Sequence, residues 1–284
     1  MGRAGHLPAM AVCVSFVIVA GSGQAGEDKS AYSLLDAVPD RLLREFNPDR
    51  PGQSHDPTTV DAGHIQLEVG AFEHVFDPRG PGFTTTRRYL YGNPNVRVGV
   101  TSDVELQVGT PLGNLIRTSG AEATRMAGLG DTTLAVKANL LGNDGGDHIL
   151  AVLPTIKLPT AARGLGNGYA EGAIFAPYNY KITKDLLLTF EPSIGVLRNS
   201  MNTRYRDSYG LIVGLDQTIT NVIIASVEIS TQVSSARKEP TNWTFTPSLA
   251  YLVSKNLQLD AGVNLGLNKA TPRYNPYLGV STRF

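Results

Sequence analysis

The connections between the apolar segments of residues 64–284 alternate between short and long, and this rhythm constrains the fold more than any single motif. In a soluble β-sandwich, nothing requires short and long connections to alternate along the chain. A transmembrane β-barrel has tight turns on one side of the membrane and longer loops on the other. The rhythm therefore predicts an all-β chain folded as a closed antiparallel transmembrane barrel.

The predicted barrel has about twelve strands, an even number, as single-chain bacterial barrels have. Within residues 257–267, apolar side chains such as Leu257 and Leu259 share one face, and Gln258 and Asp260 lie on the other. This period-two alternation suits a strand with lipid on one face and a polar lumen on the other, and it equally suits a soluble sandwich; the connection lengths, the signal peptide and the C-terminus together favour the barrel. The strands are predicted at 64–75, 88–101, 104–111, 130–141, 148–158, 171–182, 186–198, 206–217, 222–233, 243–253, 257–267 and 274–284.

Six prolines fall inside these predicted strands, where each removes a ladder hydrogen bond. We expect β-bulges or local kinks at these positions; the alternative is that some strands are shorter than the ranges above. They are Pro94, Pro154, Pro177, Pro192, Pro247 and Pro276.

Residues 1–25 have the layout of a secretory signal peptide. Arg3 is followed by an apolar stretch at 7–20 and a small-residue cleavage site that ends at Ala25. The apolar stretch is shorter than the roughly 20 residues that a spanning helix needs. Cys13, the only cysteine, lies in this stretch, so the mature chain is expected to form no internal disulfide and no thiolate metal site.

Residues 26–63 differ in character from the rest of the chain. Prolines at 48, 51 and 57 break any regular element, and the segment is too short and polar to bury its own core. Two interpretations remain open: a periplasmic tail, or a segment folded into the barrel lumen. Residues 64–284 form the predicted outer-membrane β-barrel.

Charge narrows the class of partner. Lys plus Arg and Asp plus Glu are 25 each, and loss of Arg3 with the signal peptide leaves 24 against 25, about one negative charge. A neutral chain without a basic run gives no electrostatic reason to bind nucleic acid. The expected partners are outer-membrane lipid, the barrel assembly machinery and a small-molecule solute.

Alternation also assigns a set of side chains to the lumen. Their charges have two interpretations: bracing of a narrow interior through salt bridges, which we favour, or a conduit whose charge pattern sets selectivity. The two tyrosines of the set could contact an aromatic solute or simply fill space. The set is Glu68, Tyr89, Tyr91, Arg97, Glu105, Asp131, Lys137, Lys157, Glu171, Lys181, Glu191, Asp216, Glu228, Asp260 and Arg283.

The chain ends on Phe284, and residues 278, 280, 282 and 284 share one face of the last strand. This pattern resembles the terminal strand that outer-membrane barrels present to their assembly machinery. It places both termini in the periplasm of a bacterial cell, since an even number of strands returns the chain to its starting side.

Several blocks between residues 49 and 172 carry a family resemblance. They are Asp49-Arg50-Pro51 with 59–68, Gly128–Thr133 with 137–146, and Lys157–Thr160 with 164–166 and 171–172. They resemble the outer-membrane family of MetA-pathway phenol-degradation transporters. The resemblance implies a β-barrel that passes small, often aromatic, compounds; it transfers no substrate residues.

The sequence gives little support for an enzyme active site or a metal site. The mature histidines are at positions 55, 64, 74 and 148; no serine stands in a recognisable nucleophile context, and the spacings match no common metal site. We therefore expect no enzyme, no cofactor and no metal, but a channel for small solutes. The alternatives are a non-conducting structural or adhesive barrel blocked by residues 26–63, and a barrel-embedded hydrolase.

Overall fold

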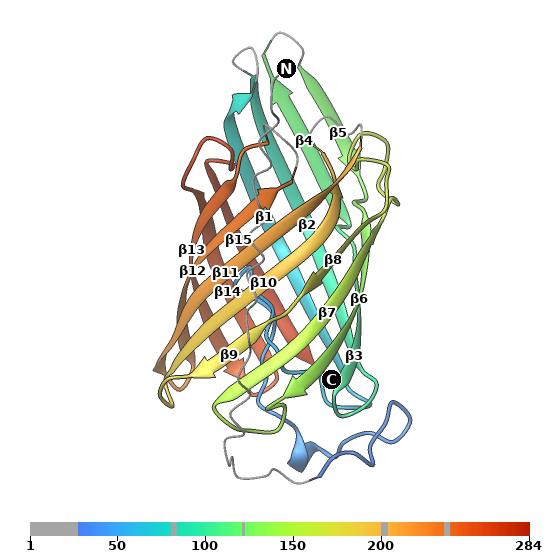
Figure 1. Cartoon of the computed structure of the whole chain (residues 1–284), viewed down its shortest axis with the longest axis vertical. Coiled ribbons are helices and arrows are strands. Elements are labelled where there is room, and N and C mark those ends of the chain that lie inside the picture. The colour runs from blue at the N-terminus through green and yellow to red at the C-terminus, as the bar shows by residue number, and fades with distance from the viewer. Residues whose placement is uncertain (1–27, 81–83, 121–122, 200–203, 236–238) are drawn as a thin grey trace, which may run out of the picture.

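The computed structural model describes residues 28–80, 84–120, 123–199, 204–235 and 239–284. The predicted signal peptide lies outside the described residues. No helix in the described ranges is long and apolar enough to cross a membrane. The chain forms one closed antiparallel β-barrel (Figure 1).

Fifteen strands follow one short 3-10 helix, η1 (Asp40–Leu42). They are β1 (Ile65–Gly80), β2 (Thr84–Gly99), β3 (Val104–Gly109), β4 (Gly113–Ser119), β5 (Thr124–Gly128), β6 (Thr132–Leu141), β7 (His148–Leu158), β8 (Glu171–Phe175), β9 (Tyr178–Lys181), β10 (Leu186–Arg198), β11 (Tyr205–Thr220), β12 (Ile223–Ser234), β13 (Asn242–Ser254), β14 (Leu257–Gly266) and β15 (Tyr274–Arg283).

Three crossings of the barrel wall are each interrupted once, as β3 and β4, β5 and β6, and β8 and β9, so the fifteen strands make twelve crossings. The barrel closes because β1 pairs with both its neighbour β2 and the last strand β15: Gln66 lies opposite Arg97 on one side and opposite Arg283 on the other. The predicted fold class and strand number are confirmed.

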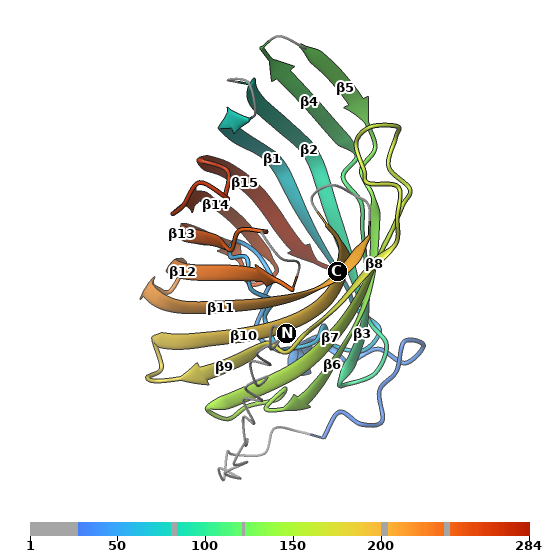
Figure 2. The same cartoon turned by 45° about the horizontal axis from the view of Figure 1, so that its top comes forward.

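The two ends of the barrel differ. The turn end carries the short connections, such as 221–222 and 255–256, and the C-terminal residue; the loop end carries connections such as 159–170. At the loop end the prediction was wrong in detail. Residues 76–87 and 112–129 are not simple loops, because β1 and β2 continue as a hairpin and β4 pairs with β5. These four strands project beyond the rest of the barrel (Figure 2).

Each of the six prolines lies at or beside a gap in a strand ladder; the recorded register shifts lie elsewhere, so the predicted bulges or kinks stay a prediction. Pro177 separates β8 from β9, and Pro94 lies opposite the break between β3 and β4. Pro247 occupies a gap in the pairing of β13 with β14. Proline has no N–H to donate, so a break in the ladder removes the cost of its presence. Pro154, Pro192 and Pro276 border similar gaps.

Burial decides which face of each strand meets lipid. On the outer face Leu249 is 55% exposed and Leu259 is 47% exposed, whereas Glu105 and Lys137 are completely buried on the inner face. A soluble protein would show the opposite distribution, since ionised side chains are almost never fully buried unless paired. The apolar belt and polar interior are those of a membrane-spanning barrel.

The turn at 142–147 offers a matched pair of glycines for a stability test. Both Gly142 and Gly146 have positive φ, +78° and +100°. A Cβ at Gly142 would overlap the carbonyl oxygen of His148, whereas a Cβ at Gly146 would meet nothing within 4 Å. We predict that Gly146→Ala costs only the left-handed penalty of about 1–2 kcal/mol and that Gly142→Ala costs more. Urea unfolding of the refolded barrel in detergent measures both; equal midpoints would contradict the prediction.

Candidate functional site

Residues 44–61, here called the lumen segment, run through the inside of the barrel from the turn end (Figure 1). Residues 33–38 contact the turn end instead, where Leu34 N–H donates to the carbonyl oxygen of Val100, so the lumen interpretation applies only to the lumen segment. The lumen segment has no regular secondary structure, so its backbone groups need partners from the wall.

Wall carboxylates supply acceptors for the backbone N–H groups of the lumen segment. Each carboxylate belongs to an inward-facing residue of a strand and is buried. The bonds join Asp49 N to Glu68 (3.1 Å), Gln53 N to Glu228 (2.6 Å), His55 N to Glu191 (2.8 Å) and Val60 N to Glu105 (2.6 Å).

Arg97 is the centre of the buried ion-pair network. Its Nε donates to Glu105 Oε1 at 2.8 Å and its Nη1 to Glu68 Oε1 at 2.8 Å. Its Nη2 donates to the carbonyl oxygen of Thr58 at 3.2 Å, and Asp49 lies 3.3 Å away. One arginine thus neutralises two wall carboxylates and anchors two points of the lumen segment, an arrangement that a rigid guanidinium favours.

Arg50 makes a similar contact from the lumen segment to β14 of the wall. Its guanidinium donates to both oxygens of Asp260, at 2.7 and 3.1 Å, and lies 5.5 Å from the ring centroid of Tyr277. Gly279 makes room for it, because any Cβ there would overlap the guanidinium. This is a bidentate pair, the strongest geometry for an arginine and a carboxylate.

A second cluster fixes the lumen segment at the turn end. Arg44 donates to Asp144 through Nε and Nη2 at 2.8 and 2.9 Å, and its backbone N–H donates to Asp61 at 2.9 Å. Lys29 contacts the same two carboxylates at 2.8 and 3.0 Å. Although partial burial opposes it, hydrogen bonds from Arg44 and Lys29 lower the pKa of Asp144 below its ordinary value.

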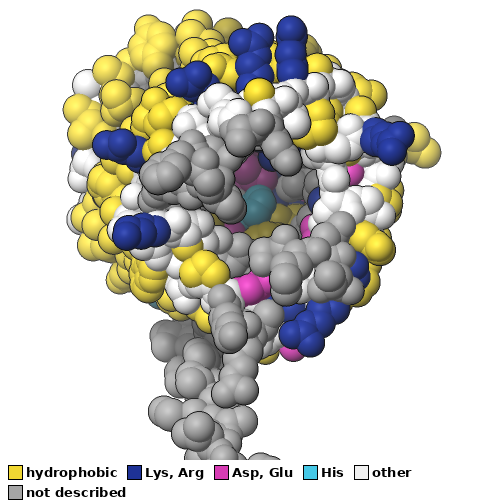
Figure 3. Space-filling model, turned by 90° about the horizontal axis from the view of Figure 1, so that it is seen from above, with side chains coloured by type: hydrophobic (Ala, Val, Ile, Leu, Met, Phe, Trp, Pro, Cys, Tyr) yellow, Lys and Arg dark blue, Asp and Glu magenta, His cyan; other side chains and the backbone are white. Residues whose placement is uncertain are grey.

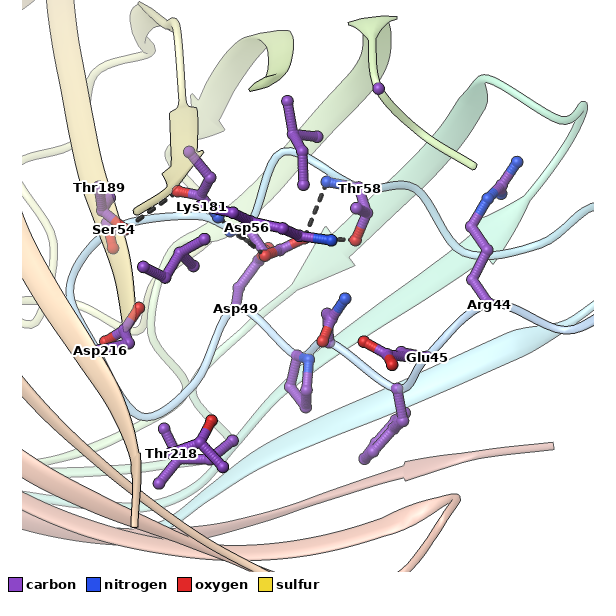
Figure 4. Close-up of a pocket in the computed structure, with 18 of the residues that line it drawn as sticks. Arg44, Glu45, Asp49, Ser54, Asp56, Thr58, Lys181, Thr189, Asp216 and Thr218 are labelled. Atoms are coloured by element: carbon purple, nitrogen blue, oxygen red, sulfur yellow. Dashed lines mark hydrogen bonds between the residues drawn. The ribbon is translucent and has the colours of Figure 1, made fainter. Parts of the chain in front are cut away.

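Two cavities remain on either side of the lumen segment. The turn-end cavity has a volume of about 1020 Å³ and the loop-end cavity about 700 Å³. Figure 3 looks down on the loop end and shows a hollow with acidic and histidine side chains at its floor. Figure 4 shows the turn-end cavity, with Asp49 and Ser54 of the lumen segment facing Lys181 and Asp216 of the wall. Both cavities are lined by Asp49, Arg50, Gly52, Ser54 and His55, so the lumen segment is the partition between them.

The structure places most of the predicted lumen residues on the inner face and divides them into three groups. Asp131, Lys157 and Glu171 form a cluster at the loop end, with Lys157 Nζ at 3.0 and 3.1 Å from the two carboxylates. Lys181 and Asp216 line the turn-end cavity. The third group contacts the lumen segment: Glu68, Arg97, Glu105, Lys137, Glu191, Glu228, Asp260 and Arg283.

Tyr89 and Tyr91 lie on the outer face, contrary to the inward direction that simple alternation gave them. Gly92 has φ +59°, which shifts the alternation of β2, and a register shift follows Gly70 in β1. Leu90, between the two tyrosines, is therefore the buried residue, and Tyr89 stacks on His74 with 4.6 Å between ring centroids. A single-residue shift turns every following side chain to the other face.

Sequence reasoning missed the lumen segment's own side chains as site residues. Gln53 donates to Thr246 and Asn264 at 2.8 and 2.9 Å, and His55 Nδ1 lies 3.1 Å from Glu191. The available signal was the excess of inward carboxylates on the wall, whose missing partners had to come from elsewhere in the chain.

The described histidines do not form a catalytic pair with a serine. His64 contacts two carbonyl oxygens, His148 contacts the Tyr178 hydroxyl, and His55 contacts Glu191. Within the described ranges, no group of three or more His, Cys, Asp or Glu side chains is arranged to hold a metal ion.

Removing the central arginine tests the network. We predict that Arg97→Met lowers the free energy of unfolding by about 3–5 kcal/mol, because Glu68 and Glu105 stay buried without their partner. Denaturant unfolding in detergent gives this value. Arg87→Met, an exposed arginine on the same strand, is the control and should change little; similar losses in both variants would refute the role of Arg97.

The cluster at Asp144 predicts a pH dependence. Because the folded pKa is lowered below the ordinary value of 3.8, the stabilisation is present above about pH 4 and is lost as the pH falls through the folded pKa. The unfolding midpoint of the unmodified chain should therefore exceed that of Asp144→Asn by a constant amount between pH 5 and 7. This difference should shrink toward pH 3, as the Asp144 carboxylate becomes protonated. A difference that stays unchanged down to pH 3 would show that Asp144 does not act through its charge.

The sequence matches one protein family, and the fold is similar to that of solved outer-membrane proteins. Residues 48–284 match the family described as "Putative MetA-pathway of phenol degradation". The fold is similar to that of an outer membrane channel from Pseudomonas putida F1, with a TM-score of 0.66 and 14% identity, covering 82% of this chain and 100% of that chain. It is also similar to the NanC porin, with a TM-score of 0.50 and 9% identity, covering 76% and 98%. At these identities the likeness establishes the fold; no curated protein matches the sequence.

Proposed function

We propose, from the premise that the chain belongs to this phenol-degradation family, that it is an outer-membrane channel for small solutes. The observation that carries the proposal is the pair of cavities, of about 700 and 1020 Å³, divided by the lumen segment alone. A solute that enters at the loop end needs only a shift of that segment to reach the turn end.

The bonding of the lumen segment supports such a shift. Apart from its prolines, Phe46 and Val60 are its apolar residues. Most of its other contacts are hydrogen bonds and ion pairs, beside the ring contacts of Arg50 with Tyr277 and of His55 with Phe175. Water can replace polar partners when a segment moves within a wet lumen, whereas an apolar core has no such substitute. The segment is therefore a displaceable partition rather than part of a packed core.

The loop-end cavity suits a small amphipathic solute. Phe175, Leu153 and Pro111 give it an apolar side, while Asn95 and Asp131 supply polar groups. Binding sites for small molecules combine an apolar lining with a few convergent polar groups. An aromatic ring with a hydroxyl group, as in a phenol, matches this lining, and no catalytic side chain takes part in the proposed passage.

We further propose that the turn end faces the periplasm and that Phe284 is read by the barrel assembly machinery. Phe284 lies at the turn end, where its backbone pairs with Ile65, and its side chain is exposed. Short turns on the periplasmic side are the rule for bacterial barrels. The apolar belt lies against outer-membrane lipid in this orientation.

A non-conducting barrel is the second candidate, favoured by the number of bonds that hold the lumen segment. Swelling of liposomes distinguishes the two. We predict size-dependent swelling with neutral sugars and small phenolics for the refolded mature chain. The paired change Arg50→Gln with Asp260→Asn should raise the population with a displaced segment at least about tenfold, because hydrogen bonds to charged groups contribute roughly 1.5–3 kcal/mol. Swelling should accelerate accordingly.

The control variant is Lys255→Gln with Asp36→Asn, which removes one exposed charge of each sign at positions that line neither cavity. It should swell liposomes at the rate of the unmodified chain. Absence of swelling in every form, with the barrels folded, would rule out the channel and leave the structural barrel.

A further inference from the structure

Three arginines form a row across the projecting strands at the loop end. Arg87 of β2 lies directly opposite Arg117 of β4, and Arg117 lies directly opposite Arg125 of β5. Neighbouring strands are about 4.7–4.9 Å apart, so the row spans about 10 Å. All three side chains are exposed.

The row lies on the outer face of the barrel. The neighbouring residues point inward: Arg88 lines the loop-end cavity and donates to Asn114, which is 1% exposed. On β5 the inward residue is Met126, against which Gly164 of the 159–170 loop packs. Since side chains alternate along a strand, Arg87, Arg117 and Arg125 point away from the lumen.

Like charges directly opposite one another destabilise a sheet. Among the residues that the structure describes, none of these three arginines forms an ion pair with a carboxylate; the one contact of the row is that of the Arg87 guanidinium, 5.6 Å from the Phe76 ring centroid. The interior of the same barrel separates its buried cations with carboxylates, as Glu105 separates Arg97 from Lys137. An external anion would remove the repulsion within the row.

The rows on either side indicate what kind of anion fits. One step toward the turn end, Tyr89, Leu115 and Ala127 lie side by side on the same outer face. One step toward the loop end, Thr85 lies opposite Ser119. The arginines thus separate an apolar row from a polar one, as the boundary between acyl chains and headgroups requires. A soluble anion would gain nothing from the apolar row.

We propose that Arg87, Arg117 and Arg125 bind the phosphate groups of a phosphorylated membrane glycolipid whose acyl chains lie against Tyr89 and Leu115. Guanidinium groups form bidentate hydrogen bonds with phosphate, and three of them in a row can contact more than one phosphate. The site is separate from the lumen and independent of solute passage.

Binding of diphosphoryl lipid A to the folded barrel in neutral detergent micelles tests the proposal. The variant is Arg87→Gln, Arg117→Gln and Arg125→Gln together. The control, Lys184→Gln, Lys255→Gln and Lys269→Gln, removes the same charge from exposed positions elsewhere. Heat-modifiable migration on gels verifies folding. The unmodified chain and the control should bind equally, and the arginine variant at least about tenfold more weakly. Added salt should weaken the binding of the unmodified chain.

Two further probes separate the lipid from its parts. Inorganic pyrophosphate should bind much more weakly than the lipid, and lipid A without its phosphates should bind no better to the unmodified chain than to the variant. Equal binding of diphosphoryl lipid A by variant and unmodified chain, or pyrophosphate binding as tight as that of the lipid, would overturn the proposal. If the triple variant does not fold, Arg117→Gln alone, at the centre of the row, must reduce lipid binding relative to Lys255→Gln.

Discussion

Pairing of buried charge is the interaction on which the rest of this structure depends. A barrel with an apolar exterior places the polar face of every strand inside, and the wall alone does not neutralise what it buries: Glu191 and Glu228 have no basic side chain of the wall bonded to them in the described structure. A buried carboxylate without a partner costs several kcal/mol. The lumen segment meets this need with backbone N–H groups and with Arg50, so the barrel and its segment form one electrostatic unit. The two interpretations of the inward charges, bracing and conduit, are therefore joined: the charges brace the lumen segment, and the lumen segment divides the conduit.

This origin of stability determines how the interior can move. Water molecules can replace the polar partners of the lumen segment one at a time, because these partners bind it mainly through hydrogen bonds and ion pairs. Two cavities already lie next to the segment. The lumen segment is held differently at its start and in its middle. Arg44 pairs with two carboxylates, one of them completely buried, whereas the part around Gly52 and Ser54 is held by hydrogen bonds, to Glu228 and through the Gln53 side chain to Thr246 and Asn264. Opening would therefore begin in the middle of the segment, where the two cavities meet, and leave the turn-end anchor in place.

The sequence predicted the fold well and the interior only in part, for reasons that particular residues show. Strand number and the gaps in the ladders at proline follow from local rules, since a proline such as Pro177 has no N–H to donate to a neighbouring strand. The outward direction of Tyr89 and Tyr91 does not follow from local rules. It depends on the positive φ of Gly92, which the neighbouring residues do not predict. The path of the lumen segment is a tertiary property: Arg50 and Asp260 are separated by 210 positions, and only the closed barrel brings them together. Short-range sequence patterns thus predict the exterior of this barrel, whereas its interior depends on contacts between residues far apart in the chain.

The contrast between the inner and outer arginines extends this reasoning. Arg97 and Arg87, the first arginine of the row, lie on the same strand, and each needs negative or polar groups nearby. Inside, each cation is surrounded by carboxylates and carbonyl oxygens of the chain itself. Outside, at the level where aromatic and aliphatic side chains give way to threonine and serine, three cations are aligned without such partners in the described structure. Evenly spaced like charges are unfavourable for an isolated sheet and favourable only beside a surface of opposite charge. The same chain thus satisfies its inner arginines with its own groups, while the outer row depends on the membrane in which the barrel lies.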